Sequence, residues 1–183
     1  MAKKTILSSL LCAIITLNGC TACKYVDTAQ KIRVGIYDSR AIAVAYAHSD
    51  FNEKRLQAKM PEMEKAKAAG DTKKIKELDA WGHAQQHKIH RQGFGTAPVD
   101  DILENIKDNL PQIRKQANVI ALVSKWDKKS LKRYKSAELI DVTDLMIAPF
   151  NPNEKVLETI EQLKKVKPIP LWQLEIMMKF KGC

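Results

Sequence analysis

Hydrophobic positions first mark three short strands, spread widely along the chain. Apolar residues alternate with other residues over 31–38 and predict a strand there. Short apolar runs predict two further strands, over 118–124 and 138–143. Because the excursion between the first two strands carries little apolar bulk, we expect a small sheet from which this excursion protrudes.

The excursion itself has helical spacing with a narrow apolar stripe. Leu56, Met60 and Met63 fall at positions i, i+4 and i+7 among many charged residues. Such a stripe is typical of a helix that pairs with one neighbour and leaves its other faces in water. Gly70 supplies a C-cap residue and a tight turn. The pattern therefore predicts an antiparallel helical hairpin over about 40–117 that turns at Gly70.

Prolines and glycines interrupt this hairpin. Pro61 and Pro111 lie inside otherwise helical patterns and predict kinks. Two glycines and a proline within 92–98 predict a loop or a sharp break, after which Thr96 is expected to cap a third helix. The apolar face of that helix is Val99, Ile102, Leu103, Ile106, Leu110 and Ile113.

The last third of the chain completes a compact body. The basic stretch 125–136 is expected to be a loop, and Asn153 is expected to cap a helix over 153–166. A short helix is expected over 171–179, inside a C-terminal extension of residues 167–183. The predicted fold class is α+β, mostly helical, with a small β-sheet body and a long protruding antiparallel helical hairpin.

The first 20 residues have the pattern of an export signal. Two lysines precede an apolar run that is too short to span a bilayer. Cys20 follows a glycine, as in a bacterial lipobox, and is the expected site of lipid attachment. The alternative is ordinary signal cleavage near Ala22, which gives a soluble periplasmic protein. Residues 21–30 are expected to form a polar tether.

The order and spacing of these elements resemble the Skp/OmpH family of periplasmic chaperones over residues 31–166. The matching segments are Ile32–Asp38, the hairpin tip Ala69–Asp71, Asn118–Val123 and Leu139–Leu145 followed by an amphipathic helix. The resemblance implies a homotrimer in which strands join in a central body and three helical hairpins surround a cavity. It also implies that the cavity holds unfolded outer-membrane proteins.

Most of the charge is explained by Lys and Glu residues that solvate long exposed helices, and the remaining positive excess is compatible with an acidic partner. The net charge is +10, and it falls to +8 when Lys3 and Lys4 leave with the signal. A basic surface attracts nucleic acid, anionic lipid or acidic polypeptide, and export argues against nucleic acid. The resemblance implies a periplasmic holdase that binds unfolded outer-membrane or envelope proteins without ATP. The alternative is a lipid-anchored scaffold that uses the hairpin to bind one folded partner.

Three residues on the excursion are candidates for contacts with client chains. Phe51, Met60 and Met63 lie on its first half, and methionine adapts to varied apolar surfaces. The alternative interpretation is that these side chains form the seam between the two helices of the hairpin.

The sequence offers little catalytic or metal chemistry. His83, His87 and His90 have the spacing of one helical face that can hold zinc or copper, but no Cys or acidic residue nearby completes a ligand set. A solvated helix face explains this spacing better. A catalytic triad cannot be assembled on a narrow exposed helix, so we expect no enzyme activity and no cofactor.

Overall fold

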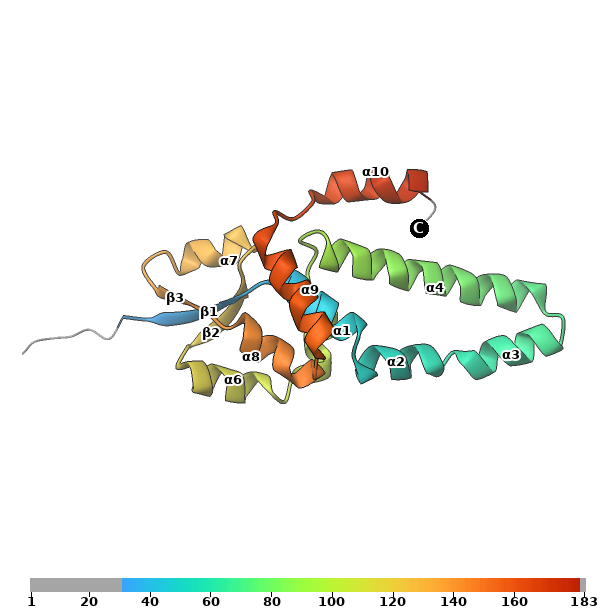
Figure 1. Cartoon of the computed structure of the whole chain (residues 1–183), viewed down its shortest axis with the longest axis horizontal. Coiled ribbons are helices and arrows are strands. Elements are labelled where there is room, and N and C mark those ends of the chain that lie inside the picture. Colours follow the sequence, from blue (N-terminus) through green and yellow to red (C-terminus); the bar gives the residue numbers. More distant parts are fainter. Residues whose placement is uncertain (1–30, 182–183) are drawn as a thin grey trace, which may run out of the picture.

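The computed structural model describes residues 31–181, which form an α+β structure that is mostly helical (Figure 1). Strands β1 (Arg33–Tyr37), β2 (Ala121–Ser124) and β3 (Glu138–Asp141) form a parallel sheet in the order β2-β1-β3. The three predicted strands are confirmed, and each is shorter than its pattern indicated.

Gly35 lets the central strand pack closely. A Cβ atom at this position would lie 2.9 Å from Leu122 Cδ2 and 3.0 Å from Val142 Cγ2. On the neighbouring residue, the side chain of Val34 is fully buried, in register with Ala121 of β2. A central strand covered in this way has no solvent-facing side, which is usual for parallel sheets.

Helix α1 (Ser39–Ala47) follows β1 directly and lies at the centre of the body. It packs against α8 (Thr143–Ile147) and α9 (Glu154–Lys165). Its alanines allow neighbouring helices to approach closely, and three of them are fully buried, namely Ala41, Ala43 and Ala45. Ile42 of α1 is also fully buried, and the other fully buried core side chains come from distant segments: Ile102, Ile106, Met146 and Ile160.

Three helices then lead away from the sheet and back again (Figure 1). The outgoing helices are α2 (Asp50–Gln57) and α3 (Met60–Ala68), and the returning helix is α4 (Thr72–Gly93). Helix α3 packs on α4, and the C-terminal part of α4 packs on α1. We call residues 50–93 the arm.

The tip of the arm has the turn that the sequence indicates. Gly70 has a φ of +64°, the left-handed conformation that glycine adopts most readily. Asp71 caps α4, since its side chain accepts a hydrogen bond from the Lys74 backbone N–H at 2.9 Å. The expected span of 40–117 is too wide, because α1 and the segment after residue 98 belong to the core of the body.

The return to β2 is broken into short helices. They are α5 (Asp100–Leu103), the 3-10 helix η1 (Glu104–Ile106) and α6 (Leu110–Ala117). Val99 holds the N-cap position of α5, so the expected cap at Thr96 is wrong. The expected apolar face is buried despite the break. Pro61 and Pro111 each lie in the first turn of a helix, where the missing N–H costs nothing.

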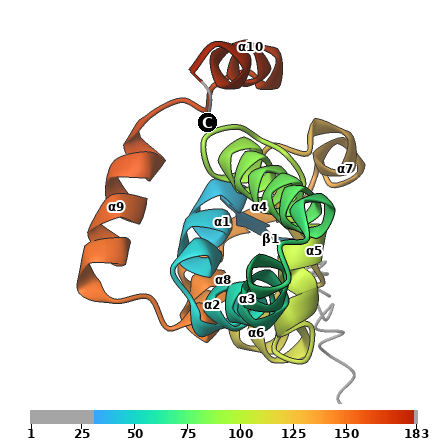
Figure 2. The same ribbon diagram turned by 90° about the vertical axis from the view of Figure 1, so that its right-hand side faces the viewer.

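The C-terminal part differs from the sequence prediction in one element. Helix α7 (Lys128–Arg133), capped by Asp127, occupies the stretch expected to be a loop. Asn153 caps α9 as predicted, accepting from the Val156 N–H at 3.0 Å. The 3-10 helix η2 (Ala148–Phe150) precedes it, and α10 (Leu171–Lys181) follows and lies beside α4 (Figure 2).

Candidate functional site on the arm

The two sides of the arm are held together by a short apolar seam and by polar links at both ends. Ala66 of α3 and Leu78 of α4 are the buried apolar residues of the seam. Near the body, Arg55 Nη1 donates to Gln85 Oε1 at 2.6 Å. These contacts make the helices one unit although little apolar area is buried between them.

A groove runs between the outgoing and returning helices, with a volume of about 350 Å³. Its outgoing wall is formed by Leu56, Met60 and Met63, and its returning wall includes Trp81 and Gly82. Glycine at position 82 adds no side chain here, and no atom lies within 4 Å of where its Cβ would be. The groove therefore has apolar residues on both walls and is open to solvent. It is also lined by the polar side chains of Lys59, Asp79, His83 and Gln86.

Trp81 lies among cations. The Arg55 guanidinium carbon and the Lys59 ammonium nitrogen are each 6.0 Å from the centre of its ring. Arg55 also lies 5.7 Å from the ring centre of Tyr46, where the arm meets the body. The groove therefore combines an aromatic wall, with cations packed against it, and lining charges of both signs, Lys59 and Asp79.

Ion pairs supplement this charge pattern on the outgoing helix. Lys59 Nζ lies 2.7 Å from Glu62 Oε1, and Lys74 approaches the other oxygen of Glu62 at 3.8 Å. The hydrogen bond from Lys59 lowers the pKa of Glu62. These pairs are exposed and add little to stability, but they keep the carboxylate of Glu62 ionised beside the groove.

The three predicted client-binding residues occupy different positions. Met60 is 55% exposed and Met63 is half-buried, and both line the groove. Phe51 is 39% exposed, and its ring makes an edge contact with Phe150 at 5.9 Å between centroids. Phe51 therefore attaches the arm to the body. Trp81 is not among the predicted site residues, although it follows Leu78 by one helical turn.

The histidines do not form a cluster with other ligands. His83 lines the groove, and both His83 and His87 line a larger cavity of about 710 Å³ between α4 and α10. The His90 ring lies 5.4 Å from the ring of Phe94. Within residues 31–181, no group of three His, Cys, Asp or Glu side chains is arranged to hold a metal ion.

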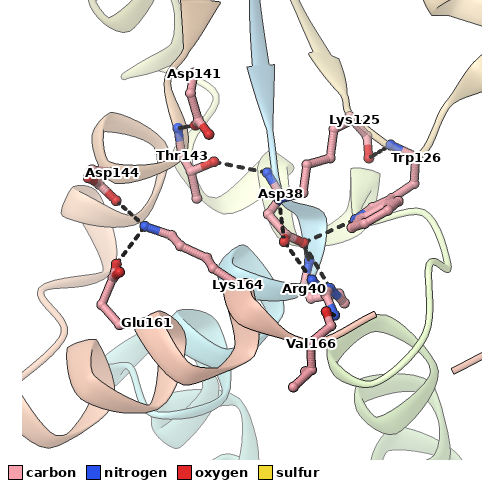
Figure 3. Close-up of polar contacts among 11 residues, drawn as sticks. Asp38, Arg40, Lys125, Trp126, Asp141, Thr143, Asp144, Glu161, Lys164 and Val166 are labelled. Carbon is pink, nitrogen blue, oxygen red and sulfur yellow. Dashed lines mark hydrogen bonds and ion pairs between the residues drawn. The ribbon is translucent and has the colours of Figure 1, made fainter. Parts of the chain in front are cut away.

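A buried polar centre lies at the carboxyl ends of the three strands, and it was not predicted from the sequence (Figure 3). Asp38 is fully buried and caps α1. Its carboxylate accepts hydrogen bonds from Arg40 at 2.9 Å and from the Trp126 indole at 3.0 Å, and it pairs with Lys125 at 2.7 Å. Its backbone N–H donates to Thr143 Oγ1 at 3.0 Å. The centre thereby joins the ends of β1, β2 and β3.

The charge of Asp38 is stabilised by these partners. Burial alone would raise the pKa of Asp38, but hydrogen bonds from Arg40, Lys125 and Trp126 outweigh it and lower the pKa to about 2. Arg40 is itself buried and donates to the Val166 carbonyl at 3.0 Å, which fixes the end of α9. The centre keeps one net positive charge, because two cations share one carboxylate, and its contacts among β1, β2 and α9 indicate a structural role.

Comparison of the chain with protein family models, with characterised proteins and with solved structures gives no match. Among the helices described within residues 31–181, none has both the length and the apolar character needed to cross a bilayer. The expected export signal, the lipid attachment site Cys20, the alternative cleavage near Ala22 and the tether of residues 21–30 lie outside the described residues.

Proposed function

We propose that this protein is a periplasmic holdase-type chaperone that binds unfolded outer-membrane or envelope proteins without ATP. In this proposal the arm is the antiparallel helical hairpin of a Skp/OmpH-like fold, and the arm groove makes many weak contacts with the client. A client held in this way stays unfolded, because no single contact fixes its conformation.

The observation that carries the proposal is the exposure of large apolar side chains on one side of the arm. Phe51, Leu56 and Met60 are all more than one-third exposed, and Leu56 and Met60 line a groove flanked by cations. Among the described residues, α4 carries no large apolar side chain of comparable exposure. A continuous apolar stripe on the outer face would have favoured a scaffold that binds one folded partner.

A second part of the proposal is that the protein associates into a homotrimer, and exposed residues of the body support it. Ile32, Ile120 and Leu139 are each about half exposed or more, and they lie in or next to the three strands. Exposed apolar side chains beside unpaired strand edges favour association with other copies. Light scattering of the mature chain at micromolar concentration should therefore give an oligomer, and a well-folded monomer would contradict this part.

The position of β1 also agrees with attachment to a membrane through Cys20. In Figure 1, β1 begins at the end of the body opposite the arm. A lipid on Cys20 would be joined to β1 through the tether of residues 21–30 and the two residues that follow it, at the end of the body opposite the arm. A Cys20→Ser variant should then move from the membrane fraction to the soluble periplasm. If wild type takes up no label from a fatty acid and is found in the soluble periplasm, Cys20 is not lipidated and the soluble form of the protein is the better proposal.

Aggregation of a denatured outer-membrane barrel protein tests the chaperone function. The mature chain in stoichiometric excess should suppress light scattering on dilution from denaturant. A Leu56→Ser/Met60→Ser variant should suppress it several-fold less, because it removes apolar contacts from the groove. Leu157→Ser is the matched control, since Leu157 on α9 is 42% exposed and Leu56 is 43% exposed.

The outcomes separate the two functions. Equal loss in the control and the arm variant would show that the groove is not the binding surface. If wild type itself fails to suppress aggregation, the holdase is wrong, and a scaffold for a folded partner becomes the better proposal.

A further inference from the structure

A second cavity lies in the body, away from the arm, at the carboxyl ends of β1 and β2. Its volume is about 390 Å³, within the range of small-molecule sites. Three parts of the chain line it: Tyr37 and Ser39 at the end of β1, residues 96–100 at the start of α5, and a group at and after the end of β2, namely Ser124, Trp126, Asp127 and Ser130. In open parallel sheets, the crevice outside the carboxyl ends of the strands is where ligands bind.

The charge of this cavity is opposite to that of the protein. Asp100 and Asp127 line it, and none of the described residues lining it is Lys, Arg or His. The chain as a whole has a net charge of +10. The nearby cations Arg40 and Lys125 lie against the Trp126 ring and share the one carboxylate of Asp38, so they leave one positive charge beside the two carboxylates of the cavity. The cavity therefore disfavours anions and favours a positively charged ligand.

An unsatisfied hydroxyl gives an independent indication of a ligand. Ser39 lines the cavity and is only 2% exposed, and its Oγ has no hydrogen-bond partner among the described residues. Buried polar groups without partners are rare in folded proteins and require an explanation. In this conformation the oxygen is enclosed by protein atoms, so an N–H donor of a bound molecule would satisfy it after rotation of the Ser39 side chain.

The negative charges of Asp100 and Asp127 both act on the hydroxyl of Tyr37. Burial raises the pKa of Tyr37 to about 12, and the negative charges of Asp100 and Asp127 add to this effect. The phenol hydroxyl therefore remains neutral and can accept a hydrogen bond. Apolar side chains of Val99 and Leu122 complete the wall and can contact an alkyl chain.

We infer that this cavity binds a primary ammonium group on an alkyl chain. An ammonium has three donors and one positive charge, which match the hydroxyls of Ser39 and Tyr37 and the carboxylates of Asp100 and Asp127. Such a group is carried by free alkyl diamines and by lysine side chains of polypeptides. The site is separate from the arm groove and does not depend on the proposed chaperone function.

The test is a titration of the full chain followed by NMR at the Trp126 indole N–H, because Trp126 lines the cavity. We expect saturable shifts with 1,5-diaminopentane and none with 1,5-pentanedioate, which has the same length and the opposite charge. The diamine should bind less tightly at higher salt, as expected for exposed carboxylates. Equal binding of both compounds, or no saturable shift up to about 10 mM diamine, would overturn the inference.

Variants distinguish this site from general attraction of cations. Asp100→Asn/Asp127→Asn should weaken diamine binding at least about tenfold, and asparagine still caps α7 at position 127. Ser39→Ala should also weaken it, whereas Asp108→Asn, an exposed aspartate outside the cavity, should have no effect. Unchanged affinity in the double variant, with an otherwise native spectrum, would contradict the site.

The source of the ammonium is read from two further ligands. Binding of the diamine but not of Nα-acetyl-lysine methylamide assigns the site to free amines. Tighter binding of the lysine derivative, and of a lysine-containing peptide, assigns it to a polypeptide side chain. Binding of neither class in the wild-type chain means that the cavity is not an ammonium site.

Discussion

Asp38 in the body and Asp71 at the tip of the arm have the same local role, helix capping, but one is buried and the other is exposed. Each caps a helix through its carboxylate. Asp38 is fully buried, and its carboxylate also accepts hydrogen bonds from the side chains of Arg40 and Trp126. Asp71 is exposed, and its carboxylate accepts a hydrogen bond from the backbone of the turn that follows it. The cap in the body is therefore part of a long-range buried network added to the apolar core, and the cap in the arm is a local contact.

The largest expected effect separates these two caps. Asp38→Asn removes the negative charge that balances Arg40 and Lys125 inside the body. Breaking a buried pair in this way costs about 3–5 kcal/mol of unfolding free energy. Asp71→Asn is the matched control and should cost less than about 0.5 kcal/mol, since asparagine caps a helix as well as aspartate does. Urea unfolding measures both, and similar losses would contradict the comparison.

Acid should remove the same contribution from wild type. The pKa of Asp38 falls from 3.8 to about 2 on folding, so its contribution is present above pH 4 and is lost as the pH falls through 2. The difference corresponds to roughly 2 kcal/mol at about 1.4 kcal/mol per pKa unit. The stability gap between wild type and Asp38→Asn should narrow over this range. A gap that stays constant between pH 5 and pH 2 would show that the charge of Asp38 is not responsible.

Glycines in the two regions provide the next comparison. Gly35→Ala places a Cβ within 3.2 Å of three side chains, namely Leu122, Val142 and Val119. Overpacking of this kind costs about 1–3 kcal/mol, because the surrounding core must shift. Thermal unfolding should show a lower midpoint for this variant. An unchanged midpoint would mean that the centre of the sheet repacks freely.

Local signals predicted the arm tip, and long-range contacts limited the rest. Gly70 and Asp71 could be read correctly because a turn and a cap depend on adjacent residues. Thr96 was assigned a cap that Val99 takes, since packing against the core decides where α5 begins. The pairing of Asp38 with Trp126 joins residues 88 positions apart, and no local pattern indicates it.

The candidate sites follow the same division. Met60 and Met63 were found because the groove wall repeats at helical spacing along one helix. The strand-end cavity was missed, since Ser39, Asp100 and Asp127 come from three separate segments. Helix α7 was also missed, because six mostly basic residues carry no apolar periodicity and only the cap at Asp127 marks its start.

The smallest expected effect is the only stabilising one, and it lies in the arm. Gly82 is inside α4, and no atom lies within 4 Å of the position of its Cβ. Gly82→Ala should therefore gain up to about 1 kcal/mol of helix stability without a steric cost. Because α4 is largely exposed, much of this gain will appear as slower hydrogen exchange in residues 72–93 rather than as a large shift in global unfolding.

Gly82→Ala also tests whether the groove needs its open wall. The added methyl group narrows the groove beside Trp81 while leaving Leu56 and Met60 unchanged. If clients use the full width of the groove, the variant will be more stable and will nevertheless suppress aggregation less. A change in stability alone would not reduce suppression in a more stable variant. If suppression is unchanged while exchange slows, the exposed wall of Leu56 and Met60 binds the client by itself. A faster exchange in α4 would instead show that glycine is required there for the packing of α3 on α4.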